Sequence, residues 1–243
     1  MIRLLTWFVF SLALFITCSG LSYQSNKMVD FGYPVWYELL QVDRHIDKYA
    51  PQNQHQKQDF HQTDKAQHLD LFAQLNNAVH EQPEILAQIQ YQTPSNQNRL
   101  LTISEVIHLK DVNILIRNLT SLWWFALIVV VVLTPIYWRG SLSFPPTKWQ
   151  LAFFSTLSAV TLLSYFTFGF DKLYAFLHES VFPENHQWFF YYQESLMTTF
   201  LKAPDLFAAF GAQISLIAMA LFLLVYMILA KKMGQRVKSS RLM

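Results

Sequence analysis

Four long apolar segments constrain the fold of this chain more than any other feature of its sequence. None of them carries a lysine, arginine, aspartate or glutamate in its middle, and they cover residues 4–21, 122–138, 149–168 and 207–230. About 20 mostly apolar residues suffice to cross a bilayer as a helix. The mean hydropathy of +0.21 and the 16% share of aromatic residues agree with this interpretation. The sequence therefore predicts an all-α membrane protein with four transmembrane helices.

Charge asymmetry predicts the orientation of these four spans. One set of connectors holds basic residues and no acid: Arg3, Arg139, Lys148, Lys231, Lys232, Arg236, Lys238 and Arg241. All 16 acidic residues fall in the other two connectors, 22–121 and 169–206. Basic loops stay in the cytoplasm. We therefore expect both termini to be cytoplasmic, the two acidic connectors to be extracytoplasmic, and residues 1–243 to form one integral membrane domain.

The first span has an alternative interpretation as a cleaved signal peptide. Cys18 ends a stretch that resembles a lipoprotein cleavage box, but Thr17 stands where a small residue is preferred. An uncleaved anchor accounts for the topology without further assumptions, so we expect the first span to be retained.

The longer outer connector contains several local signals. Residues 51–63 are polar and rich in glutamine, which predicts a loop or a mobile stretch. Apolar residues at helical spacing predict an amphipathic helix over 64–81, and residues 92–96 predict a turn. Thr102 followed by Glu105 matches a capping box, so a helix should begin there.

The shorter outer connector carries a helical pattern over 171–182. Pro183 should end that helix, since proline lacks the N–H that the helix needs. We expect both outer connectors to add helical segments at the outer membrane surface.

Composition excludes several classes of function. The single cysteine, Cys18, rules out an internal disulfide and a multi-cysteine metal site. The net charge of +2 is too small to indicate nucleic-acid binding. The chain lacks a glycine-rich phosphate loop, a G-x-S-x-G elbow and an HExxH zinc motif. We therefore expect no cofactor, no metal and no nucleic-acid partner.

Two histidines stand out among eight that all lie in the outer connectors. Glu105 and Asp111 lie three residues either side of His108, within reach on a helix, as in a general-base pair. His178 lies near the membrane surface, where burial would keep it neutral and suited to act as a base. The alternative is that both are ordinary interfacial residues. His45, His55, His61, His68, His80 and His186 are interpreted as structural.

The two histidine segments together resemble a known family. Residues 102–112, TISEVIHLKDV, and residues 176–190, FLHESVFPENHQWFF, resemble the signature segments of bacterial lipoprotein intramolecular transacylases. The motifs are a histidine followed by Asp-Val before the second span, and then a histidine, Phe-Pro and Trp-x-Phe between the third and fourth. Pro204 with Phe207 resembles the pair that precedes the last span.

The resemblance implies a reaction and a set of site residues. An acyl chain would move from the diacylglyceryl group of a lipoprotein cysteine to that cysteine's own amine, in the bacterial inner membrane. His178 would act as the base and His108 as its partner, in roles that could be exchanged. Glu105 or Asp111 would orient His108. The remaining expected residues shape the substrate wall or donate to the oxyanion: Phe182, Pro183, Asn185, Trp188 and Tyr191.

Two other functions stay open at this point. The first is a non-catalytic scaffold or subunit that binds an envelope protein through its outer loops. The second is a metal or pH sensor, which would need three or more outer-loop histidines to converge.

Overall fold

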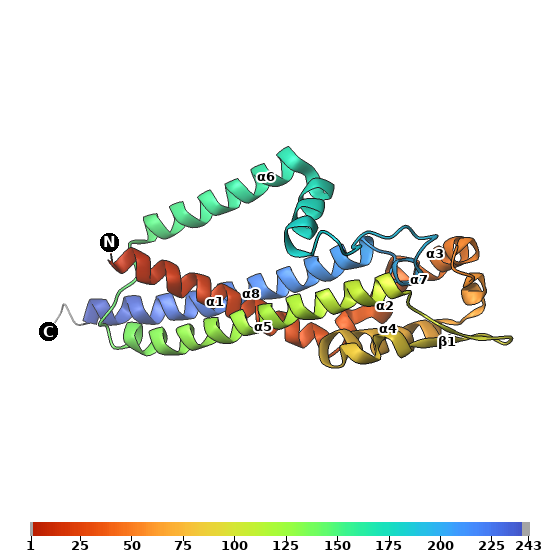
Figure 1. Cartoon of the computed structure of the whole chain (residues 1–243). Helices are drawn as coiled ribbons and strands as arrows, with labels where there is room; N and C mark the ends of the chain where they lie inside the picture. The colour runs from red at the N-terminus through yellow and green to blue at the C-terminus, as the bar shows by residue number, and fades with distance from the viewer. Residues whose placement is uncertain (1, 240–243) are drawn as a thin grey trace. The chain divides into compact units, whose positions relative to one another are not determined.

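The computed structural model describes residues 2–239, the side chains of 165, 170, 171 and 233–239 excepted (Figure 1). These residues form two compact units. Unit 1 contains the residues up to Ser22, then Leu119–Val181, and those from Ser215 onwards. Unit 2 contains Tyr23–Asn118 and Phe182–Ile214.

Four helices are long and apolar enough to cross a membrane, which confirms the predicted spans. They are α1 (Ile2–Lys27), α5 (Ile103–Trp138), α6 (Thr147–Val181) and α8 (Asp205–Ser239). The helices extend beyond the apolar segments, because their polar ends belong to the outer connectors. α6 is interrupted at Gly169, whose φ of 75° lies in the left-handed region. It ends at Val181, two residues before Pro183, as the proline predicts.

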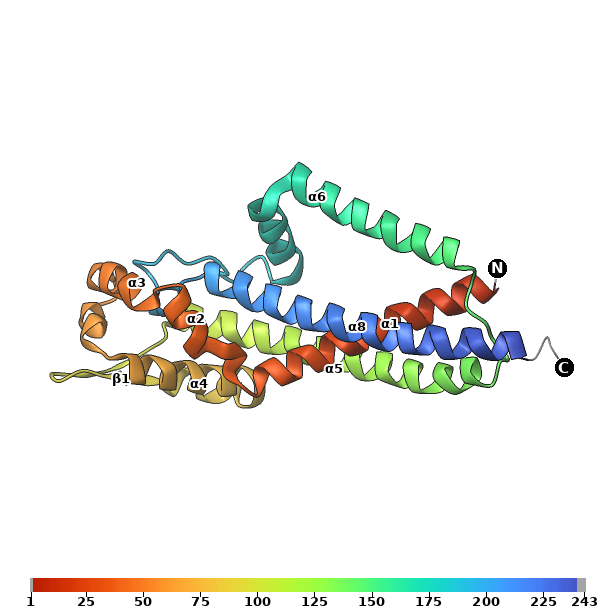
Figure 2. The ribbon, with the colours of Figure 1, turned by 180° about the vertical axis from the view of Figure 1, so that it is seen from behind.

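Unit 1 is held together by aromatic side chains between its helices. Its portions of α1, α5 and α8 lie side by side (Figures 1 and 2) around Trp7, Phe10, Tyr137 and Phe222. Trp7 Nε1–H donates to the hydroxyl of Tyr226 over 2.8 Å, which satisfies an indole donor that the apolar surroundings would otherwise leave unpaired.

Helices α1 and α5 approach closely at Gly20. A Cβ on this residue would lie 2.1 Å from Cδ1 of Trp123. The Trp123 indole donates to the carbonyl of Thr17 over 3.1 Å. The absence of a side chain at Gly20 therefore lets the indole bond to the helix backbone, a use of small residues that is frequent between transmembrane helices.

Unit 2 is built from shorter elements around one apolar core. Its own helices are α2 (Tyr33–Leu39), α3 (Val42–Tyr49), α4 (Lys65–Glu81) and α7 (Leu196–Phe200). Short 3-10 turns connect them: η1 (Asp30–Gly32), η2 (Ala50–Gln52), η3 (Gln58–Gln62) and η4 (Pro83–Gln88).

The predicted amphipathic helix over 64–81 is confirmed as α4. Asp64 caps it by accepting the N–H of Gln67 over 2.8 Å. Its buried face points Leu71, Phe72 and Leu75 into the core. There Phe72 stacks on Tyr33 with the ring centroids 4.1 Å apart, and the Tyr33 hydroxyl donates to the carbonyl of Phe200. The core of unit 2 thus joins the two outer connectors.

A short antiparallel hairpin, β1 (Gln90–Gln92) and β2 (Gln97–Arg99), follows α4. The predicted turn over 92–96 is confirmed, since it connects these strands. The strands themselves were not predicted, because glutamine, asparagine and arginine give no strand signal. Tyr91 anchors the hairpin in the core and donates its hydroxyl to Asp59 over 2.6 Å.

Candidate functional site

The capping box predicted at the start of α5 is present, and it fixes Glu105. The carboxylate accepts the N–H of Thr102, while Thr102 Oγ1 accepts the N–H of Glu105 over 3.4 Å. Glu105 also accepts the hydroxyl of Ser195 and, over 3.4 Å, the N–H of Met197. Its side chain is fully buried. Glu105 therefore links the start of α5 to the start of α7, which gives this predicted site residue a structural task.

His108 lies one turn further along α5, in an aromatic setting. Its ring meets Phe182 edge to face, with centroids 4.9 Å apart, and lies 6.0 Å from Phe190. Both phenylalanines come from the second outer connector. The structure thus brings together the two segments that carry the histidine motifs, at His108 and Phe182.

Asp111 has a partner that the sequence analysis did not assign. The Nδ1 atom of His186 lies 2.6 Å from Asp111 Oδ2, with the two side chains 32% and 12% exposed respectively. The carboxylate accepts, so Nδ1 carries the proton and Nε2 keeps the lone pair in the neutral ring. This is the arrangement in which a carboxylate orients a histidine for base catalysis.

Sequence reasoning placed His186 among the structural histidines, and no local signal would have singled it out. Its partner lies 75 residues away in the sequence. The fold brings them together because Pro183 and His186 close a turn, in which the N–H of His186 donates to the carbonyl of Pro183 over 3.0 Å.

His178 lies in the last turns of α6, in unit 1. Its Nδ1 donates to the carbonyl of Tyr174 over 2.8 Å, and the two rings lie 3.9 Å apart. A carbonyl can only accept, so in the neutral ring Nε2 holds the lone pair, the tautomer that a base at Nε2 requires. His108 belongs to unit 2, and the expected meeting of His108 with His178 stays a prediction.

The residues expected to shape the substrate wall all lie in one stretch of unit 2. Phe182 and Trp188 are half-buried, while Pro183, Asn185 and Tyr191 are exposed. Phe189 and Tyr191 leave large apolar surfaces uncovered, being 53% and 62% exposed. An exposed apolar stretch of this kind suits contact with lipid chains.

Two other histidines of unit 2, His68 and His80, have hydrogen-bond partners away from this site. Tyr37 and Thr63 bond to the two ring nitrogens of His68, and Tyr23 bonds to His80. Among the residues that the structure describes, no three histidine, cysteine or acidic side chains could hold a metal ion together.

Comparison with known proteins gives consistent results. The chain resembles two solved structures of the membrane-integral lipoprotein intramolecular transacylase Lit from Bacillus cereus. One matches at 14% identity and a TM-score of 0.67, covering 100% of this chain and 99% of the other. The second, of a point variant, matches at 13% identity and a TM-score of 0.66, covering 98% and 95%. These matches show a shared fold.

A comparison with curated protein sequences gave no match. The sequence model of the lipoprotein intramolecular transacylase family Lit, by contrast, matches residues 4–204, which include both histidine segments. The resemblance inferred from the motifs is thereby confirmed, and the chain belongs to the lipoprotein intramolecular transacylase family.

Proposed function

We propose that this protein is a membrane transacylase that acts on lipoproteins carrying a diacylglyceryl cysteine. The observation that carries the proposal is the family match over residues 4–204. In the reaction, the free α-amine of the cysteine attacks one ester carbonyl of its own diacylglyceryl group. The ester C–O bond breaks, the acyl group forms an amide with the nitrogen, and the glycerol oxygen regains a hydroxyl.

The first requirement of this reaction is a base. The amine is mostly protonated near neutral pH and must lose its proton before it can attack. His178 is the base that the motif favours, and its Nε2 holds a lone pair. His186, oriented by Asp111, offers the same chemistry in unit 2. Either imidazolium could return the proton to the departing glycerol oxygen, so that no proton is gained or lost overall.

The second requirement is stabilisation of the oxyanion that forms at the carbonyl. Donors placed around that oxygen lower the barrier because they are already oriented before the reaction. His108 is the proposed partner of the base in this role. Asn185 and Tyr191 carry donors on the exposed stretch next to it. Because the amine and ester belong to one molecule, holding them together supplies much of the advantage.

The third requirement is access from the lipid. The exposed Phe189 and Tyr191, with Phe182 and Trp188 beside them, would bind the acyl chains. The basic residues around the N-terminus, the 138–149 connector and the C-terminus support a topology with both termini in the cytoplasm. The histidines would then face the extracytoplasmic side of the bacterial inner membrane, where processed lipoproteins present their amine.

Mass spectrometry of lipoprotein N-terminal peptides from bacterial cells tests the proposal. Cells expressing the native chain should yield N-acylated lyso-peptides, and cells expressing His108→Ala at equal membrane levels should not. If the native chain inserts in the membrane and a diacylglyceryl substrate is present but no N-acylation appears, the chain does not carry out this reaction. A non-catalytic role for the outer connectors would then explain the structure better.

A further inference from the structure

The hairpin β1–β2 has one edge that is covered and one that is open. Two bonds flank its short ladder, from Thr93 N–H to the Asn96 carbonyl over 2.8 Å and from Leu100 N–H to the Ile89 carbonyl over 2.9 Å. In an antiparallel ladder, bonded and non-bonded pairs alternate. Ile89 and Leu100 are a bonded pair, and the register places Gln90 opposite Arg99 as the next pair along the ladder. Gln90 and Arg99 are therefore a non-bonded pair, whose N–H and C=O groups point outwards.

The outer edge of β1 is occupied by a side chain. Gln92 N–H donates to Oε1 of Gln67 over 2.6 Å, and Nε2 of Gln67 donates to the Gln92 carbonyl over 2.9 Å. One amide side chain thus pairs with the edge of β1 as a neighbouring strand would. This pairing confirms that the non-bonded positions of the hairpin point outwards.

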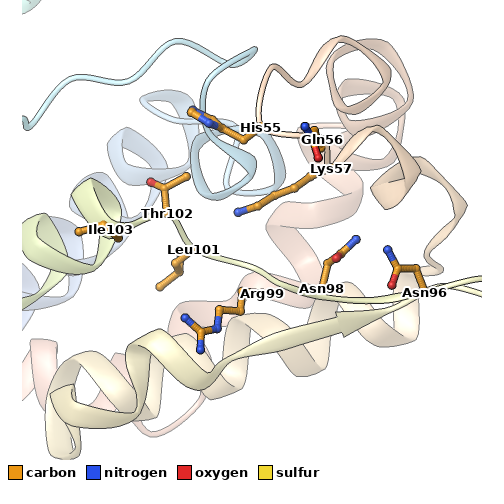
Figure 3. A pocket seen from close by; sticks show the side chains of 9 residues that line it. All are labelled: His55, Gln56, Lys57, Asn96, Asn98, Arg99, Leu101, Thr102 and Ile103. Atoms are coloured by element: carbon orange, nitrogen blue, oxygen red, sulfur yellow. The ribbon is translucent and has the colours of Figure 1, made fainter.

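The outer edge of β2 borders a cavity instead. The cavity holds about 450 Å³ and is lined on one side by the stretch from Asn96 to Ile103. Figure 3 shows His55, Gln56 and Lys57 on its other side. Within the part of the chain that the structure describes, the Arg99 backbone forms no hydrogen bond to a residue outside the hairpin. An exposed pair of strand groups beside a cavity is a template for another extended chain.

The opposite wall comes from the glutamine-rich stretch whose role the sequence left open. Gln56 has a φ of 59°, a strained value for a residue with a side chain. The strain is maintained because Asn53 Oδ1 accepts the N–H of His55 over 2.8 Å, and the N–H of Gln54 donates to Gln193 over 2.8 Å. Strained backbone held in this way is typical of ligand clamps.

The lining indicates what the cavity would bind. Asn96 Oδ1 accepts the N–H of Gln97, and Asn98 Nδ2 donates to Asp59. The Gln56 amide, the amide nitrogen of Asn96 and the amide oxygen of Asn98 still offer donors and acceptors together, which match a peptide backbone. An anion is a poorer match. Lys57 already donates to the Leu100 carbonyl over 2.9 Å. Burial lowers the pKa of Lys57, and the nearby carboxylate of Glu105 opposes this shift.

We propose that the outer edge of β2 binds the extended polypeptide that follows the lipidated cysteine of the substrate. This inference rests on the proposed function, which requires a substrate with a peptide attached to its lipid. Residues 97–101 would present ~13 Å of strand edge, enough for about four substrate residues. The peptide would add a third strand beside β2, with backbone bonds that do not depend on substrate sequence.

Binding measurements on full-length protein in detergent micelles test the proposal without relying on turnover. The ligands are diether analogues, which cannot transfer an acyl group: a lipidated cysteine amide, and the same molecule with six further residues. Calorimetry should show about tenfold tighter binding of the longer ligand, since several new backbone bonds each contribute modestly. In a series of ligands that each carry one N-methylated backbone amide among the six residues, the gain in affinity should be lost at every second position only.

Matched variants locate the binding edge. Arg99→Pro removes an outward N–H beside the cavity, and Gln90→Pro removes the equivalent outward N–H on the other edge of the hairpin. The gain from peptide length should disappear in Arg99→Pro and persist in Gln90→Pro. If Arg99→Pro does not fold, the N-methylation series on the native protein decides.

Equal affinity of the native protein for both ligands would overturn the proposal, and so would a gain that N-methylation reduces without a two-residue period. A gain that Arg99→Pro leaves intact in a folded protein would also exclude this edge. The proposed function has a separate readout. It uses the same two ligands made as diesters, which can transfer an acyl group. If these diesters bind with the expected pattern but are never transacylated, the proposed function fails while the peptide site stands.

Discussion

His186 Nδ1 lies 2.6 Å from Asp111 Oδ2, and this pair joins the two outer connectors beside His108. The contact makes Asp111 the candidate positioning residue for His186, and it gives the second outer connector a carboxylate-bound imidazole of its own. The two candidate bases can therefore be separated by experiment.

His186→Gln should reduce transacylation at least about 100-fold if His186 is the base, since general-base catalysis contributes that much. Asp111→Asn should then give a similar loss together with an altered pH–rate profile, because the amide no longer orients the ring through a negative charge. The measurement is the rate of N-acyl formation with a diacylglyceryl lipopeptide. A loss of less than threefold in His186→Gln would leave the Asp111–His186 pair a structural contact.

His178→Gln provides the opposite test. If His178 is the base, this variant should lose at least about 100-fold in rate, while His186→Gln stays near the native rate. Tyr174→Phe is a suitable control. It preserves the backbone carbonyl that accepts from His178 Nδ1 and removes only a hydroxyl. A rate in His178→Gln close to that of the control would exclude His178 as the base.

Much of the fold follows from local sequence signals. The spans come from hydropathy, the start of α5 from Thr102 and Glu105, and the end of α6 from Pro183. In each case the cause lies within a few residues of its effect. That is why these elements can be predicted from one sequence.

The rest depends on contacts between distant segments. The hairpin is an example, because its polar strands gain their pairing from Gln67 and Asp59 rather than from strand propensity. The same holds for the candidate site. Helical spacing suggested that Glu105 and Asp111 serve His108. The fold provides them with Ser195 and His186 as partners, from a connector that local spacing does not reach.

Glu105 should prove essential for stability. Glu105→Ala leaves the N–H groups of Thr102 and Met197 and the Ser195 hydroxyl without their buried acceptor. The expected cost is about 3 kcal/mol, since each unsatisfied buried donor is expensive. Glu105→Gln keeps one acceptor oxygen and should lose less. Thermal denaturation in detergent measures both, and equal Tm values for native and Glu105→Ala protein would contradict this role.

His68 should make the stability of unit 2 depend on pH. The ring is 3% exposed. Thr63 donates its hydroxyl to the Phe60 carbonyl, so it accepts from His68 Nε2–H, and the Tyr37 hydroxyl donates to Nδ1. The neutral ring is thus fully bonded. Burial lowers the pKa of His68 to about 4, against the opposing charges of Asp64 and Asp43.

The direction of the effect follows from linkage. In the unfolded chain His68 binds a proton below its ordinary pKa of 6.5, and in the folded protein only below about 4. The stabilisation is therefore complete above pH 6.5 and is lost progressively as the pH falls towards 4, by up to about 3 kcal/mol. His68→Gln should be less stable at pH 7.5 but should lose less Tm between pH 7.5 and 4.5. His61→Gln, which changes an exposed histidine, should keep the native pH dependence. An identical slope in all three proteins would show that His68 protonation does not contribute to the acid sensitivity of the fold.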